Sequence, residues 1–153
     1  MFFTDWADVA RDLTLGLDSL EDGEFLVLGE ADHAVVPRRG LFGRRSRSDA
    51  ARYVQVLRIT DVLSAECVGA TALGGTCVMS EDMILQLREL GWLTAEESLT
   101  QYGTVTPNFE LYVDLSSTPA LAYVLVASLQ LLDVRPEHLE LITSSGNAHS
   151  SAG

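Results

Sequence analysis

A helix with almost no polar side chains must be buried on more than one side, and the segment 119–133 predicts such a helix. Residues 121–127 are apolar without interruption. At roughly 14 residues the helix is too short for the ~20 residues that span a bilayer. We therefore expect it to pack inside a globular domain or against a second copy of the chain. Of these two outcomes we predict a homodimer, with Leu125 and Leu129 at the contact between the two copies.

Short apolar strands and two amphipathic helices account for most of the remaining chain. Apolar residues at spacings of three and four predict a first helix that begins after Thr4 as its N-cap and ends at Gly23. A second helix is predicted to follow Ser80, which would cap it. Strands are predicted at 24–29, 53–60, 63–68, 76–79 and 109–115, residues 93–108 read as a connection, and 137–142 could add an edge strand.

This order predicts an α+β fold in which a twisted antiparallel sheet packs against helices, in the order α-β-β-β-β-α-β-α. With 153 residues, of which 47% are hydrophobic, the chain can bury one core without metals or disulfides. We expect a single domain over residues 1–142, with an arginine-rich loop insert at 37–52 and a disordered tail at 143–153.

The charge of the chain is large and unevenly distributed. The formal net charge is −12, which disfavours nucleic acid and anionic lipid as partners over most of the surface. The basic residues are all arginine, which hints at a GC-rich genome, and six of the ten lie at 37–52 beside only one of the 22 acidic residues. This insert is either a solvated loop or a docking element for an acidic partner or a membrane surface. Its candidate partner-binding residues are Arg38, Arg39, Leu41, Phe42, Arg44 and Arg45.

No group of residues carries a recognisable catalytic or metal-binding pattern. Cys67 and Cys77 lack the CxxC spacing and lie far from the histidines, so we interpret them as core residues. The glycine-rich segment 69–75 has no GK[ST] and precedes a predicted strand, so it reads as a turn. We expect no catalytic residue, no cofactor and no metal. The start of the chain shows no secretory signal and no span is long enough for a bilayer, so we expect a cytoplasmic protein.

Four segments together resemble a known family. They are Tyr53-Val54-Gln55-Val56, Leu90-Gly91-Trp92, the strand 109–115 and the helix 119–133. Their order and residue pattern resemble those of the small chaperones of type III secretion systems and of the YbjN-like peptide-binding chaperones. Actinobacterial members of the YbjN-like group carry a similar Leu-Gly-Trp sequence. The resemblance covers about residues 4–142.

The resemblance implies an α+β domain, often paired as a homodimer, that binds peptide segments of client proteins without catalysis. The residues lead independently to a binding module, because an apolar helix and exposed strands offer surface for a peptide or partner. We therefore expect a non-enzymatic chaperone or adaptor. The alternative is a regulatory protein that docks an acidic partner or membrane surface through its arginine-rich loop.

Overall fold

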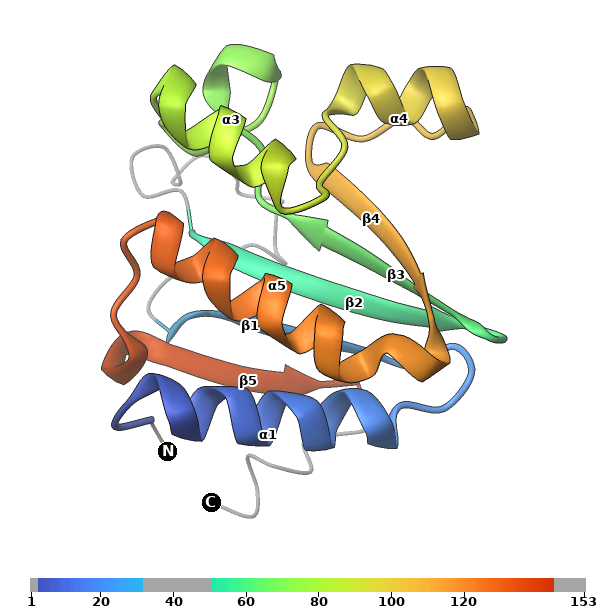
Figure 1. The fold of residues 1–153 in the computed structure, drawn as a ribbon, viewed down its shortest axis with the longest axis vertical. Helices are drawn as coiled ribbons and strands as arrows, with labels where there is room; N and C mark the ends of the chain where they lie inside the picture. Colours follow the sequence, from blue (N-terminus) through green and yellow to red (C-terminus); the bar gives the residue numbers. More distant parts are fainter. Residues whose placement is uncertain (1–2, 32–50, 145–153) are drawn as a thin grey trace.

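Five antiparallel strands form an open sheet in the order β4-β3-β2-β1-β5, with α1, α3 and α5 on one side of it (Figure 1). The structure is a computed structural model that describes residues 3–31 and 51–144. The described helices are α1 (Trp6–Ser19), α3 (Glu81–Glu89), α4 (Ala95–Tyr102) and α5 (Thr118–Leu131), with short 3-10 turns at Thr71–Leu73, Leu115–Ser117 and Pro136–His138. The strands are β1 (Phe25–Glu30), β2 (Tyr53–Ile59), β3 (Val62–Cys67), β4 (Phe109–Asp114) and β5 (Leu139–Thr143). The predicted α+β class is confirmed.

The predicted strand at 76–79 does not form. The preceding strand, β3, lies between β2 and β4, so both of its edges are already taken. The segment instead turns back on itself, and Ala70 and Cys77 make one isolated parallel bridge. Gly75 allows this turn, because an added Cβ there would lie 2.2 Å from the backbone carbon of Gly69. The sheet gains its fifth strand at the chain's other end, where β5 pairs with β1.

The connection 93–108 contains a helix that the sequence analysis missed. Thr94 and Glu97 form a capping box, in which each side chain accepts a hydrogen bond from the other residue's backbone N–H, and α4 follows. This helix is short and polar, so no apolar stripe in the sequence predicts it. The first helix also begins differently from the prediction: Asp5 caps it by accepting from the Asp8 N–H, while the Thr4 hydroxyl donates to the Asp8 side chain.

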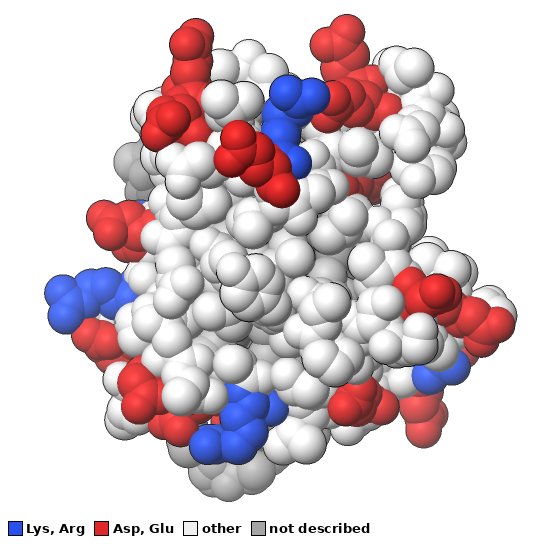
Figure 2. Space-filling view, in the orientation of Figure 1, with Lys and Arg blue, Asp and Glu red and all other residues white. Residues whose placement is uncertain are grey.

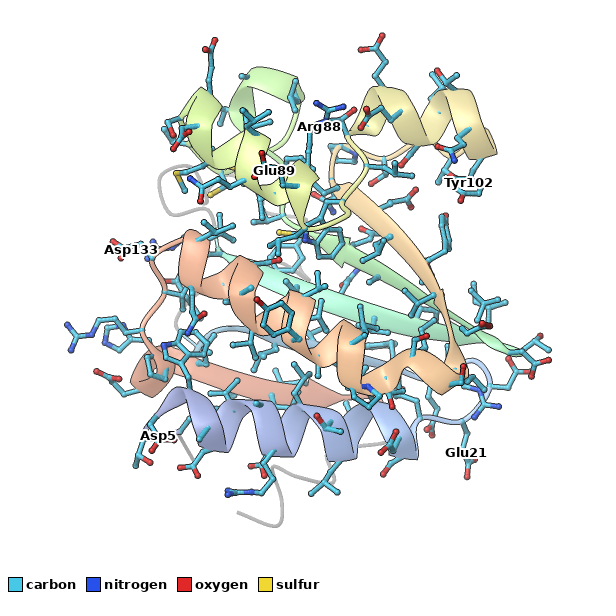
Figure 3. All side chains as sticks on the ribbon, viewed as in Figure 1. Asp5, Glu21, Arg88, Glu89, Tyr102 and Asp133 are labelled. Atoms are coloured by element: carbon cyan, nitrogen blue, oxygen red, sulfur yellow. The ribbon has the colours of Figure 1, made fainter. Side chains whose placement is uncertain are left out.

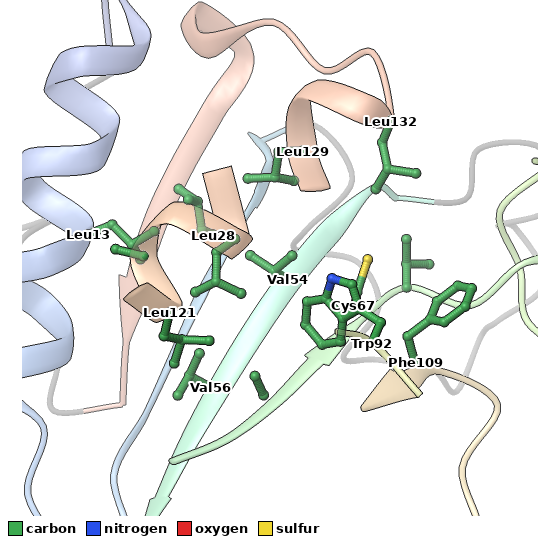
Figure 4. Packing of buried hydrophobic residues seen from close by; sticks show 14 of the residues in the cluster. Leu13, Leu28, Val54, Val56, Cys67, Trp92, Phe109, Leu121, Leu129 and Leu132 are labelled. Carbon is green, nitrogen blue, oxygen red and sulfur yellow. The ribbon is translucent and has the colours of Figure 1, made fainter. Parts of the chain in front are cut away.

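The apolar helix α5 lies in the middle of the helical layer. It packs on β2, against α1 on one side and α3 on the other (Figures 1 and 4). Leu125 and Leu129 are both 0% exposed within a single chain. Both side chains belong to the core of the single chain, so in this structure they are not exposed to a second copy. Tyr123, on the outward side of the helix, is 68% exposed.

The core lies between this helical layer and one face of the sheet. It includes Leu13 of α1, Val54 and Val56 of β2, and Cys67 of β3, which confirms the interpretation of Cys67 as a core residue (Figure 4). Trp92 follows α3 and is also buried. Because α1, α3 and α5 take up one face of the sheet, the other face is the candidate binding surface.

Candidate functional site

The second face of the sheet meets a helix of the described residues only at its β4 edge, where the ring of Tyr102 contacts that of Tyr112. Residues directly opposite each other on paired strands share a face, so the strand registers define this surface. We call it the open sheet face. Its members are Phe25, Val27, Gly29, Tyr53, Gln55, Leu57, Ile59, Val62, Ser64, Glu66, Glu110, Tyr112, Asp114, Glu140 and Ile142.

One half of the open sheet face is apolar. Phe25 lies opposite Leu57, and Ile59 lies opposite Val62. We call these four residues the apolar strip, and their exposed fractions lie between 38% and 50%. A pocket of about 260 Å³ opens beside Phe25 and Leu57. Large apolar side chains gathered on a sheet face without a covering layer are typical of a surface that meets a partner.

The other half of the open sheet face is polar and ordered by Asn108. The Asn108 side-chain amide donates to the Glu66 carboxylate at 2.9 Å and to the Tyr53 hydroxyl at 3.2 Å. Its carbonyl oxygen accepts from the Gly69 N–H at 3.0 Å. Burial raises the pKa of the Tyr53 hydroxyl, which therefore stays protonated at neutral pH. Asn108 thus fixes the Glu66 carboxylate at the border of the pocket.

A second carboxylate lies directly opposite Glu66 on the neighbouring strand. Glu110 is 3% exposed, and the Tyr112 hydroxyl donates to it at 3.3 Å. Tyr112 in turn packs edge-on against Tyr102, with ring centroids 4.8 Å apart; Tyr102 lies at the outer end of α4 in Figure 3. The residues around α4 therefore cover the Glu110 end of the open sheet face, and within residues 3–31 and 51–144 the apolar strip stays exposed.

The outer edge of β4 is only partly paired. Leu93 exchanges two backbone hydrogen bonds with Glu110, which shows that the peptide groups of Glu110 point away from β3. Alternation along the strand turns those of Tyr112 the same way, and they have no backbone partner within the described residues. The Asp114 carbonyl is already the first acceptor of the 3-10 turn Leu115–Ser117. One further residue of a strand could therefore be added at this edge.

The helical side offers a second candidate surface. The middle of that side, over α5, carries no charged side chain, and the charges lie around its margin (Figure 2). A groove of about 410 Å³ runs between α3 and α5. Its lining residues are Gln86, Glu89, Leu90, Ala127, Gln130 and Leu131. Beyond the groove, an ion pair from Arg88 to Glu97 ties α3 to α4; Arg88 is labelled in Figure 3.

The arginine-rich residues predicted to bind a partner, Arg38, Arg39, Leu41, Phe42, Arg44 and Arg45, lie outside the described residues, as does the predicted tail from residue 145 onward. The two strands that flank the insert are joined by a clasp. The Arg52 guanidinium donates to both oxygens of the buried Glu30 carboxylate, at 3.1 and 2.5 Å, and to the Leu132 carbonyl at 2.8 Å. This clasp fixes the two ends of β1 and β2 from which the insert departs.

The structure gives no support for a metal or redox site at the two cysteines. Both are free thiols, and burial raises the pKa of each. Within residues 3–31 and 51–144, no three His, Cys, Asp or Glu side chains come together as a metal site would require. No helix of the same residues is long and apolar enough to cross a membrane.

The comparisons with known proteins place these features in a family. Residues 3–143 match the family model TY-Chap3, described as "T3SS (YopN, CesT) and YbjN peptide-binding chaperone 3". Searches of the curated proteins and of the solved structures give no match. The match covers nearly the whole described domain, including both faces of its sheet, and it confirms the resemblance drawn from the four sequence segments. The chain belongs to the TY-Chap3 family of type III secretion and YbjN peptide-binding chaperones.

Proposed function

We propose that this chain is a non-enzymatic chaperone or adaptor that receives an extended client segment on the open sheet face. The observation that carries the proposal is the apolar strip: four large side chains, each more than a third exposed, lie together on a sheet face that the described helices leave uncovered. The family supports a peptide as the partner. The unpaired edge of β4 gives such a segment a place to add backbone hydrogen bonds.

The size of the apolar strip sets the strength of this interaction. Burying a large apolar side chain completely is worth about 1.5–3 kcal/mol, and between a third and a half of each strip residue remains to be buried by a partner. The four residues together therefore supply about 2.5–5 kcal/mol, which on its own corresponds to a dissociation constant of about 0.2–15 mM. Backbone hydrogen bonds or further contacts along a longer client must supply the rest. A chaperone gains from such weak contacts, because it must release its client.

A matched pair of serine variants tests the proposal. Ile59→Ser removes one strip residue that is 50% exposed, while Leu15→Ser removes a 59% exposed leucine from the outer side of α1. We expect Ile59→Ser to weaken client capture about threefold to tenfold, and Leu15→Ser to leave it unchanged. Capture is measured by anisotropy of labelled, unfolded client peptides. Equal losses in the two variants, or none in Ile59→Ser, would reject the open sheet face as the binding surface.

The proposed assembly is a homodimer that uses the outward side of α5. The observation that favours it is the uncharged surface over this helix, where Tyr123 is exposed beside the groove between α3 and α5. Sedimentation equilibrium of the wild type at tens of micromolar should give twice the chain mass. Tyr123→Asp should give a folded monomer, because it places a charge at the contact without touching the core. A wild type that sediments as a monomer contradicts this assembly.

A regulatory role for the arginine-rich insert is the second candidate, favoured by the gathering of six of the ten basic residues at 37–52. In that case, changing Arg38, Arg39, Arg44 and Arg45 to Ser should abolish binding to an acidic partner or an anionic vesicle without changing the melting temperature. Wild-type binding should also fall steeply as salt rises. Binding of an uncharged client peptide to the apolar strip tolerates added salt, so the salt dependence measured with such a peptide separates the two candidates. For either role we propose a cytoplasmic location.

A further inference from the structure

We infer that the open sheet face selects client segments that present basic and apolar residues on the same side. The inference rests on the proposed function and adds the chemistry of the client. It comes from the charges on this face, which are all of one sign. Its four charged residues are Glu66, Glu110, Asp114 and Glu140.

No arginine of the described residues is free to neutralise these carboxylates. Four of the five described arginines pair with carboxylates elsewhere: Arg11 with Asp8 and Asp12, Arg52 with Glu30, Arg88 with Glu97, and Arg135 with Glu137. The fifth, Arg58, donates to the backbone carbonyls of Leu20 and Thr60. The described arginines therefore make their contacts away from the open sheet face. The charged side chains of this face are all carboxylates.

The arrangement of Glu66 and Glu110 gives this charge a definite place. The two residues lie directly opposite on neighbouring strands, where like charges repel each other. Their side-chain hydrogen-bond partners, Asn108 and Tyr112, are neutral. A guanidinium or ammonium group brought by a client would relieve this repulsion and gain a charge-assisted hydrogen bond.

The same pocket joins the acidic and apolar halves of the face. Glu66 lines it together with Phe25 and Leu57 of the apolar strip. An arginine or lysine can therefore place its aliphatic stem along the strip while its charged end reaches Glu66. An extended client segment that carries apolar and basic residues two positions apart, and therefore on the same side, meets both requirements, whereas an acidic segment is repelled. The charge complementarity thus defines a partner of stated chemistry.

Three peptides of equal length test this specificity on the full chain. Each alternates leucine and serine, with two of the leucine positions occupied by arginine, by its neutral isostere citrulline, or by glutamate, so that the test residues lie on the same side as the remaining leucines. We expect the arginine peptide to bind about three- to tenfold more tightly than the citrulline peptide at low salt, and the glutamate peptide to bind most weakly. The difference between arginine and citrulline should shrink at physiological salt.

Two variants assign the effect to the open sheet face. Glu66→Gln keeps an acceptor for Asn108 and removes the charge, so it should abolish the preference for arginine over citrulline while citrulline binding persists. Asp114→Asn should reduce the preference less, and it is available if Glu66→Gln fails to fold. Glu96→Gln makes the same change at an exposed position on α4 and should leave the preference intact.

The outcomes separate this inference from the proposed function. Equal binding of the arginine and citrulline peptides overturns the inference and leaves the chaperone proposal standing. Failure of all three peptides to bind rejects both. A preference that survives Glu66→Gln, or that is lost in Glu96→Gln, places the selection elsewhere and overturns the inference. A Glu66→Gln protein whose mass in sedimentation differs from that of the wild type also overturns the inference. A second copy of the chain would then occupy the open sheet face. Arginine selectivity that emerges only when Arg38, Arg39, Arg44 and Arg45 are changed to Ser would also overturn the inference, because the chain's own insert would then supply the cations.

Discussion

Replacing Ser128 by alanine tests the buried hydrogen bonds that join α5 to the turn after α3. The Trp92 indole N–H donates to the Ser128 hydroxyl at 2.8 Å, and this hydroxyl donates to the Val124 carbonyl at 2.6 Å. Trp92 is 1% exposed and Ser128 is 0% exposed. Water therefore cannot replace the hydroxyl when Ser128→Ala removes it, and the indole N–H is left without an acceptor.

The size of the effect follows from this burial. An unsatisfied buried donor costs about 1–3 kcal/mol, while the better helix propensity of alanine returns at most about 0.5 kcal/mol. We expect Ser128→Ala to lower the free energy of unfolding by about 1–2.5 kcal/mol. For a chain of this length, that loss lowers the melting temperature by about 2–10 °C. Urea unfolding followed by tryptophan fluorescence and by circular dichroism gives the free energy directly.

Ser98 supplies a matched control. It is also fully buried in a helix, but its hydroxyl has no hydrogen-bond partner within the described residues. Ser98→Ala therefore removes an unsatisfied polar group and should leave the protein as stable as before, or more stable. Trp92→Phe combined with Ser128→Ala completes a double-mutant cycle, for which we expect a coupling of about 1 kcal/mol. Equal losses for the two serine variants, or a coupling of zero, would refute the assignment of this stability to the Trp92–Ser128 hydrogen bond.

Two further substitutions test the core and the clasp, and one labelling experiment tests the buried Cys67 thiol. Leu129→Ala should cost about 2–5 kcal/mol in chemical unfolding, because it opens a cavity beneath α5, and a cost below 1 kcal/mol would mean that this side chain is not in the core. Arg52→Ala should cost about 1–3 kcal/mol, because it leaves the buried Glu30 carboxylate unpaired; the value is smaller than for a fully buried pair since the Arg52 side chain is 35% exposed. Burial raises the pKa of Cys67, so a thiol reagent at pH 8 should modify it only after unfolding, and rapid labelling of Cys67 in the native protein would contradict its place in the core.

Local patterns predicted the elements whose signals lie within one segment. The apolar run of α5, the serine cap and glycine stop of α3, and the alternation of β4 each gave an element close to its observed bounds. The capping box at Thr94 and Glu97 was also present in the sequence and could have revealed α4. What local pattern could not predict is which strands become neighbours. The position beside β3 goes to β4, some forty residues along the chain, and not to the nearby segment 76–79.

The candidate site shows the same division more sharply. The sequence by itself determined an acidic α+β domain with a helix too apolar to lie on a surface, because composition and periodicity depend only on the order of residues. It could not tell which side of that helix faces outward, since nearly every side is apolar; packing against α1, α3 and β2 buried Leu125 and Leu129 and left Tyr123 exposed. The open sheet face also exists only in the folded chain. Strand registers bring Phe25, Ile59 and Glu66 to one surface, and the described helices α1, α3 and α5 pack on the opposite face, so only the tertiary structure gathers these side chains on one exposed surface.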